Sequence, residues 1–249
     1  IYVKFNTELC IFEWFYVFSL GQSEPEQAER SVRIFCIILT QPKNHAMKAM
    51  AVNDTWARRC TSYFFATSVA DSRFPNFLAV YREGREVLWD KVKYSLIHVA
   101  QKYADSHEFF LKADDDTYMI MENLEKILER MNSSEPFIMG RHFRLPRTSL
   151  DYLSGGSGYV MSRAALLRIV RGFESHSACG GSMHGGPEDV LVGRCAKAVG
   201  VKMIESLDEF GLEMFHPFDP RGMFNPMTVK NVRWFADFNY QKAVTVSLT

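Results

Sequence analysis

The chain has 249 residues, which is enough for one large α/β domain or two small ones. Lysine plus arginine total 29, and aspartate plus glutamate also total 29, so the net charge is zero. This balance argues against a general nucleic-acid-binding protein and gives no signal for binding at a membrane surface.

The first 31 residues differ in pattern from the rest. Residues 9–20 are strongly apolar apart from Glu13. A bilayer span needs about 20 residues, so this shorter run is either part of a membrane anchor or a hydrophobic leader. Residues 21–31 are polar and acidic and are typical of a stem. We therefore expect a leader and stem over residues 1–31 and one globular domain over residues 32–249.

The globular part alternates apolar runs with helical patterns. Apolar runs predict strands at residues 32–40, 63–67, 78–80, 109–113, 137–140 and 201–204, and another directly after a glycine-rich segment that ends at residue 158. Helical spacing predicts helices after Pro42 and at residues 86–103, 121–131, 164–173 and 187–198. In the helix after Pro42, we expect four residues near one face: Ala46, Met47, Met50 and Trp56. This order predicts a parallel or mixed sheet with helices on both faces.

The strand at residues 109–113 ends in three consecutive carboxylates, Asp114, Asp115 and Asp116. Two unit charges about 4 Å apart interact by roughly 1 kcal/mol in water and about 4 kcal/mol near a protein surface, so this cluster favours a bound cation. Oxygen ligands at the carboxyl end of a strand suit Mg²⁺ or Mn²⁺, and Asp114 and Asp116 face the same way in an extended segment. The alternative is a solvated acidic turn that caps the helix near Met121.

A glycine-rich segment precedes a strand in the second half of the chain. It contains Gly155, Gly156 and Gly158 and lacks the spacing of a dinucleotide-binding fingerprint. Such a segment allows either the close approach of the backbone to a ligand or a tight turn.

Glu188 and Asp189 follow Pro187 in the first turn of a predicted helix. Acids are ordinary at this position because they complement the helix dipole. A carboxylate stabilised in this way stays ionised, as a general base requires, so catalysis is the other interpretation.

Two aromatic segments lie near the C-terminus. His216 stands between aromatic residues and before Pro217, and such a histidine is either a metal ligand or a satisfied core or turn residue. The segment from Trp234 to Tyr240 is suited to stacking on a sugar or a base, which makes these two aromatic residues candidates for acceptor binding.

The five cysteines lack the Cys-x-x-Cys spacing of a metal site. The preferred pairing is Cys36 with Cys60 and Cys179 with Cys195, which leaves Cys10 over. Each bridge would contribute about 3 kcal/mol by closing its loop. The alternative is a set of buried, reduced thiols in a cytosolic protein.

Two sequons for N-glycosylation are present, Asn53-Asp54-Thr55 and Asn132-Ser133-Ser134. They agree with a secretory route. Because sequons also arise by chance, they add little weight by themselves.

Several motifs occur in the order seen in the β1,3-glycosyltransferases of family 31. The longer ones are Ala113-Asp114-Asp115-Asp116-Thr117-Tyr118, Gly155-Gly156-Ser157-Gly158-Tyr159-Val160, Glu188-Asp189-Val190 and Phe215-His216-Pro217-Phe218. Further shared-looking pieces are Thr55-Trp56-Ala57-Arg58-Arg59-Cys60, Glu83-Gly84-Arg85 and Leu88-Trp89-Asp90-Lys91. The chain thus resembles this family over residues 32–240, and within the family it is most similar to the core 1 β1,3-galactosyltransferases.

The resemblance implies a single α/β domain of GT-A type, Rossmann-like, with a mixed sheet and helices on both faces. It implies an inverting enzyme that moves galactose from UDP-galactose, in β1,3 linkage, onto O-linked GalNAc of glycoproteins. It also implies Mn²⁺ as cofactor and a single-pass type II membrane protein of the Golgi with a lumenal catalytic domain. The expected partners are glycoprotein acceptors that carry O-linked GalNAc. A homodimer is compatible with the resemblance, and no nucleic-acid partner is expected.

The resemblance also assigns residue roles by motif. Asp116 and His216 would hold the metal, and Asp114 would lie near the ribose or the metal. Asp189 would be the catalytic base, with Glu188 beside it. The other matched residues expected to bind the donor are Asp115, Arg85, Lys91, Gly155 and Gly156. The family's paired cysteines would be the same two pairs, Cys36–Cys60 and Cys179–Cys195.

Three alternatives compete with this hypothesis. A non-catalytic, chaperone-like homologue would lack the acidic metal motif, which this chain keeps. A metal-dependent hydrolase would need more histidine and aspartate ligands near the site. A β1,3-transferase with a different acceptor is the third, because the chain after Tyr240 lacks the cysteine pair of core 1 members.

Overall fold

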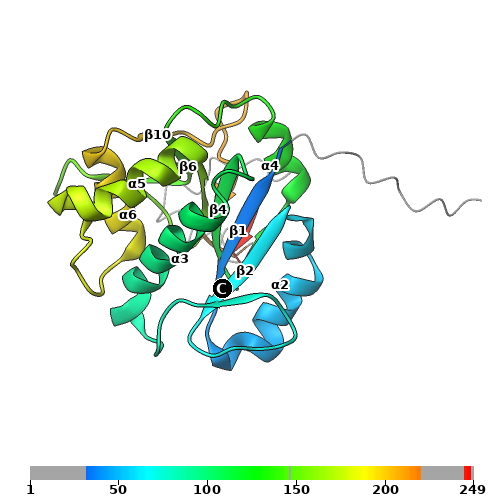
Figure 1. The fold of residues 1–249 in the computed structure, drawn as a ribbon. Coiled ribbons are helices and arrows are strands. Elements are labelled where there is room, and N and C mark those ends of the chain that lie inside the picture. The colour runs from blue at the N-terminus through cyan, green and yellow to red at the C-terminus, as the bar shows by residue number, and fades with distance from the viewer. Residues whose placement is uncertain (1–31, 146, 220–243, 248–249) are drawn as a thin grey trace, which may run out of the picture. The chain divides into compact units, whose positions relative to one another are not determined.

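The structure is a computed structural model, and it describes residues 32–145, 147–219 and 244–247. Its centre is a seven-stranded sheet with the strand order β10-β6-β9-β4-β1-β2-β3 (Figure 1). The strands are β1 (Ile34–Leu39), β2 (Ser62–Thr67), β3 (Asn76–Leu78), β4 (Phe109–Asp114), β6 (Phe137–Gly140), β9 (Tyr159–Ser162) and β10 (Lys202–Ile204). Neighbouring strands are parallel except at β9, which is antiparallel to both β4 and β6.

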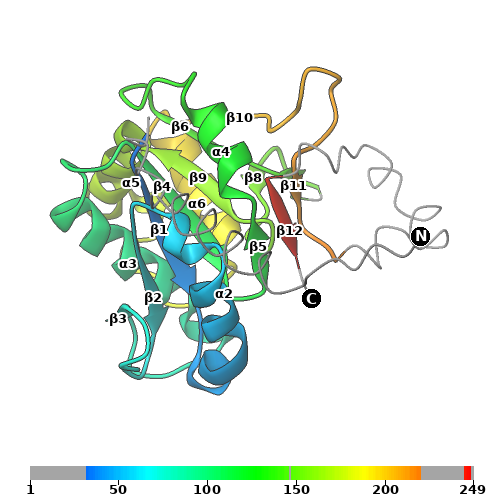
Figure 2. The ribbon, with the colours of Figure 1, turned by 90° about the vertical axis from the view of Figure 1, so that its right-hand side faces the viewer.

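Helices cover both faces of this sheet (Figures 1 and 2). One face carries α3 (Leu88–Lys102), α5 (Arg163–Ser175) and α6 (Glu188–Ala198), and the other carries α2 (Met50–Asp54) and α4 (Met121–Leu128). Strand β1 shows why two cores form. Its alternate residues Phe35 and Ile37 pack in the core under α3, whereas Ile34, Cys36 and Ile38 pack in the core on the other face. A strand buried on both faces reads as an unbroken apolar run. The predicted mixed α/β domain is confirmed.

The segment after Pro42 departs from the prediction. It is an irregular series of short turns, with 3-10 turns at Pro42–Asn44 and Ala57–Arg59, a π-helical turn at His45–Ala49, and α2. Met47, predicted on the buried face, is 81 % exposed, so that assignment is wrong. The π-helical turn is wider than the α-helical turn assumed from the sequence, and it shifts which residues face the sheet.

Two small sheets complete the described fold. One joins β11 (Phe215–His216), β12 (Thr245–Ser247) and β5 (Thr117–Met119), and the other pairs β7 (His142–Arg144) with β8 (Asp151–Leu153). Sequence patterns did not predict these strands because two or three residues are too few to show a period. The β11-β12-β5 sheet connects His216 to β5, the strand that follows the aspartate cluster, with β12 lying between them.

The two predicted disulfides, Cys36–Cys60 and Cys179–Cys195, are both present, with S–S distances of 1.98 and 2.02 Å. The second ties the loop before α6 to that helix. None of the helices in the described ranges has the length and hydropathy to cross a bilayer. Cys10 and the two predicted acceptor residues, Trp234 and Tyr240, lie outside the described residues.

Candidate active site

The antiparallel strand β9 brings the separate motifs to one edge of the sheet. Because β9 is antiparallel to β4, the first residue of β9 lies beside the C-terminal end of β4, and Tyr159 pairs with Lys112. The glycine-rich segment that leads into β9 therefore lies at the edge where the aspartate cluster leaves β4. This is the carboxyl edge of the parallel strands, where open α/β sheets bind their ligands.

Each acid of the aspartate cluster has a different partner. Asp114 forms an ion pair with Lys112, with Oδ1 and Nζ 2.8 Å apart, and Asp116 forms one with Lys48, with Oδ2 and Nζ 2.9 Å apart. Asp115 is buried, and its Oδ2 accepts hydrogen bonds from the Thr40 hydroxyl at 2.6 Å and from the side-chain amide of Asn44 at 2.9 Å. Burial raises the pKa of Asp115, against the lowering effect of these two hydrogen bonds.

A cleft of about 650 Å³ opens beside the cluster. All three aspartates line it, together with two residues that the motifs assign to donor binding, Arg85 and Lys91. Arg85 is exposed. Lys91 is buried, donates to the Thr40 carbonyl at 2.7 Å and forms an ion pair with Glu83. The cleft thus combines acidic and basic side chains, and its volume is in the range of small-molecule sites.

A buried charge network behind the cleft was not predicted. The ammonium of Lys112 contacts Asp114, Glu188 at 2.7 Å and the Gly155 carbonyl at 3.2 Å. Glu188 also accepts a hydrogen bond from the Tyr159 hydroxyl at 2.8 Å. Burial by itself lowers the pKa of Lys112, but the nearby charges of Asp114 and Glu188 outweigh it and raise that pKa. A lysine inside the apolar run at residues 109–113 was the available signal for this network.

Asp189 faces the glycine-rich segment. Its Oδ2 accepts a hydrogen bond from the backbone N–H of Gly155 at 3.2 Å, and its Oδ1 accepts one from Val190 at 2.8 Å. Asp189 is half-buried, whereas its neighbour Glu188 is buried, and burial raises the pKa of Glu188 while Lys112 opposes that rise. The two adjacent acids therefore differ in access, and only Asp189 is open to a substrate.

Gly155 closes a ring between these groups. Its carbonyl binds Lys112, its N–H binds Asp189, and a Cβ at this position would lie 2.5 Å from Oε1 of Glu188. A side chain has no room here, because the backbone of Gly155 lies close to the protein's own acids. The predicted approach of this segment to a ligand stays a prediction.

Gly156 links the aspartate cluster to the His216 segment. Its carbonyl accepts a hydrogen bond from the Thr117 hydroxyl at 3.1 Å, and a Cβ at Gly156 would lie 3.7 Å from the carbonyl of Pro217. His216 is buried, and burial lowers its pKa to about 4, with a smaller contribution from Arg141. The imidazole is therefore neutral at pH 7, the form that binds metals.

No three histidine, cysteine, aspartate or glutamate side chains within the described ranges are gathered as a metal site. The residue types nevertheless fit a divalent cation, since Asp114 and Asp116 supply carboxylates at one edge and His216 supplies a neutral imidazole from a segment that meets them at Gly156. Lys48 pairs with Oδ2 of Asp116, which leaves Oδ1 of the same carboxylate as the oxygen for a metal.

Comparison with known proteins defines the class. The family model described as Fringe-like matches residues 30–244, and the chain therefore belongs to the Fringe-like family.

Individual relatives narrow the resemblance. The chain is 38 % identical over 198 residues to the glycoprotein-N-acetylgalactosamine 3-beta-galactosyltransferase 1 of Xenopus laevis, a match that covers 80 % of this chain and 54 % of that protein. It is 27 % identical to the N-acetyllactosaminide beta-1,3-N-acetylglucosaminyltransferase 4 of Mus musculus, covering 80 % of this chain and 65 % of the relative. It is 28 % identical to the human chondroitin sulfate synthase 3, a match that covers 72 % of this chain and 22 % of that protein. The chain thus spans about half the length of the first of these relatives.

Among solved structures, a glycosyltransferase involved in the glycosylation of the major capsid of PBCV-1 superposes with a TM-score of 0.46 at 15 % identity, covering 87 % of this chain and 94 % of the other. A Drosophila beta-1,4-galactosyltransferase 7 mutant in complex with manganese, UDP-Gal and xylobiose superposes with a TM-score of 0.40 at 13 % identity, covering 70 % and 65 %.

Proposed function

We propose that this chain is the catalytic domain of an inverting glycosyltransferase that moves galactose from UDP-galactose, in β1,3 linkage, onto O-linked GalNAc of glycoproteins. The observation that carries the proposal is the position of Asp189, open to substrate, at the same sheet edge as the aspartate-lined cleft. The named activity of the Xenopus relative is the basis for the choice of sugar and acceptor.

The cleft is the proposed donor site. Lys48 and Arg85 bring positive charge to it for the diphosphate, and Asp116 and His216 would hold Mn²⁺ with Asp114 nearby. When bound, Mn²⁺ would neutralise negative charge on the leaving UDP. Asp115 and Lys91 are buried and fixed by their own partners, so we assign them to shaping the cleft.

Asp189 is the proposed general base. It would take the proton from the acceptor hydroxyl as that oxygen attacks C1 of galactose on the side opposite UDP, which inverts the anomeric centre. The N–H groups of Gly155 and Val190 hold the carboxylate in position. Glu188 is buried against Lys112 and Tyr159, so we assign it a positioning role.

We further propose that the domain works in the Golgi lumen as part of a type II membrane protein. The two disulfides support an oxidising compartment. Trp234 and Tyr240 remain the proposed acceptor residues.

Calorimetric binding of UDP tests the donor site. Wild type should bind UDP with Mn²⁺ and lose that binding in EDTA, and Asp116→Ala should bind weakly in both conditions. Asp105→Ala, at an exposed aspartate beyond the end of α3, is the control and should bind like wild type. Binding that ignores both EDTA and Asp116→Ala would refute the metal-dependent donor site.

A further inference from the structure

The two N-glycosylation sequons have opposite environments. Asn53 lies in α2 and is only 3 % exposed. Its side-chain Nδ2 donates a hydrogen bond to the Asp54 carboxylate, and its side-chain Oδ1 accepts one from the Tyr63 hydroxyl. The hydroxyl of Thr55, which completes the sequon, donates to the Ala51 carbonyl at 2.6 Å. A glycan on Asn53 is incompatible with this packing.

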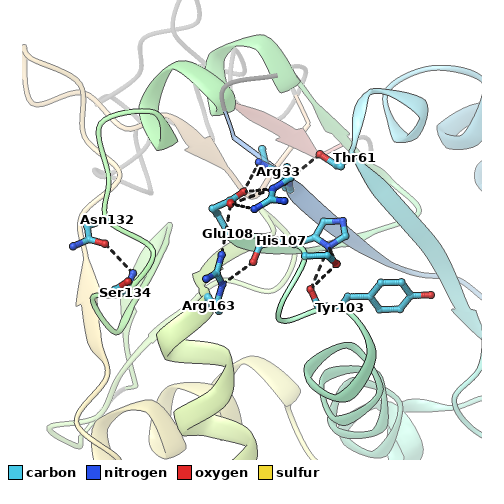
Figure 3. Close-up of polar contacts among 10 residues, drawn as sticks. Arg33, Thr61, Tyr103, His107, Glu108, Asn132, Ser134 and Arg163 are labelled. Atoms are coloured by element: carbon cyan, nitrogen blue, oxygen red, sulfur yellow. Dashed lines mark hydrogen bonds and ion pairs between the residues drawn. The ribbon is translucent and has the colours of Figure 1, made fainter. Parts of the chain in front are cut away.

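Asn132 is exposed, in the turn between α4 and β6. Its Oδ1 accepts a hydrogen bond from the backbone N–H of Ser134 at 3.0 Å, and its backbone carbonyl accepts one from Glu135 at 3.0 Å. This is an Asx-turn closed within the sequon itself. In Figure 3 the amide nitrogen of Asn132, the atom that carries a glycan, points away from Ser134. Ser134 is also exposed, so both defining side chains of the sequon are accessible.

The turn lies at the edge of the sheet opposite the candidate active site. Strand β6 runs parallel to β4, and Asn132 comes before the first residue of β6, Phe137. The turn is held there by a hydrogen bond from the Ala164 N–H to the Ser133 carbonyl. Figure 3 shows it to one side of the ion pairs that Glu108 makes with Arg33 and Arg163, at the beginning of β4. A large substituent on Asn132 would leave the donor cleft open.

We propose that Asn132 is an N-glycosylation site of this protein and that Asn53 is not. The co-reactant is an oligosaccharide carried on a lipid diphosphate. Nδ2 of Asn132 forms a bond to the anomeric carbon of the oligosaccharide, the bond from that carbon to the diphosphate oxygen breaks, and the lipid diphosphate leaves with the electron pair while the amide loses a proton. The inference rests on the lumenal location proposed above.

The test is site mapping on the whole chain, directed into the secretory pathway of a eukaryotic cell by a cleavable signal. Removal of N-glycans with an amidase in ¹⁸O-water converts a glycosylated asparagine to labelled aspartate. We expect the label at position 132 and unmodified asparagine at position 53. Ser134→Ala should abolish the label, whereas the matched variant Ser133→Ala keeps the sequon and should retain it.

The outcomes separate this proposal from the proposed function. Unmodified Asn132 in secreted protein whose Cys36–Cys60 and Cys179–Cys195 bridges have formed would overturn the glycosylation site. A label at Asn53 would overturn it as well. Calorimetric UDP binding on the same samples reports on the proposed function independently, and Ser134→Ala should bind UDP as wild type does, because residue 134 lies at the opposite edge of the sheet.

Discussion

The two acidic motifs of this protein reach the same edge of the sheet from different elements. The aspartate cluster leaves the end of strand β4, whereas Glu188 and Asp189 open helix α6. In each motif one acid is buried and satisfied by the protein. Asp115 is held by Thr40 and Asn44, and Glu188 by Lys112 and Tyr159. The acids Asp116 and Asp189 keep more contact with solvent.

The comparison shows that neighbouring carboxylates in one motif differ in burial and can therefore have different roles. A buried carboxylate with fixed partners shapes the site, and its more accessible neighbour is available for chemistry. The motifs differ in how they are supported. Asp116 pairs with the flexible ammonium of Lys48, whose side chain is 43 % exposed, while Asp189 is held by backbone N–H groups. The partner of Asp116 is thus a long, partly exposed side chain, whereas the partners of Asp189 belong to the backbone.

The largest expected effect comes from removing the carboxylate of Asp189, in the motif at the start of α6. Asp189→Asn should lower galactose transfer to a GalNAc-peptide by about 10³-fold, because the proposed general base is lost. UDP affinity should stay within about twofold, since Asn keeps an oxygen for the Gly155 N–H. Steady-state transfer assays and calorimetry measure both quantities. If Glu188→Gln, and not Asp189→Asn, abolished transfer while leaving UDP binding intact, the roles of the two acids would be reversed.

Next comes the contrast between the two lysines. Lys112→Met leaves the buried Glu188 and the partly exposed Asp114 without their cation and should lower the free energy of unfolding by about 3–5 kcal/mol. Lys48→Met breaks a more exposed pair and should cost at most about 1 kcal/mol. Urea unfolding at pH 7 in EDTA measures both variants. Equal losses would mean that burial does not distinguish the two ion pairs.

A smaller difference in stability is expected between alanine variants of Gly155 and Gly156. Gly155→Ala places a Cβ 2.5 Å from Glu188 and should cost about 1–3 kcal/mol of stability and lower transfer, because Asp189 shifts with the ring. At Gly156 the nearest atom would be 3.7 Å away, so Gly156→Ala should change the unfolding midpoint little. Thermal unfolding of the two variants side by side tests this, and a larger loss at Gly156 would contradict the packing described at Gly155.

The smallest expected effect is at Asp115. Because burial raises its pKa, the folded state binds a proton there more readily than the unfolded chain does. The stability from this group is present at acid pH and is lost as pH rises through the raised pKa. Both of its hydrogen bonds go to Oδ2, so Asn can accept them too. Asp115→Asn should be more stable than wild type at pH 7 by about 1 kcal/mol, and the difference should vanish near pH 4.

Urea unfolding of Asp115→Asn between pH 4 and pH 7, in EDTA, measures this change. A variant that is several kcal/mol less stable than wild type at pH 7 would show that the fold depends on the charge of Asp115.

Much of the fold follows from local pattern. The strand at residues 109–113 and the helices near residues 88–102 and 188–198 appear in the sequence because buried strands are continuously apolar and helices repeat every 3.6 residues. Both cysteine pairs were predicted from the absence of a metal-site spacing and from the resemblance to the family. The aspartate cluster and Glu188-Asp189 were also predicted as candidate site residues, because the sequence shows their residue types and their positions at the ends of predicted elements.

Only the tertiary structure decided which members of each motif are buried. The sequence placed Asp114 and Asp116 on one side of an extended segment but did not show that Asp115 is buried, and it gave no difference in burial between Glu188 and Asp189. The direction of β9 brought Tyr159 against Glu188 and Gly155 against Asp189, and Lys112 became the shared cation of Asp114 and Glu188. The π-helical turn that exposes Met47 likewise has no local signature. Burial of a polar group depends on partners far away in the chain, and a local period carries no information about them.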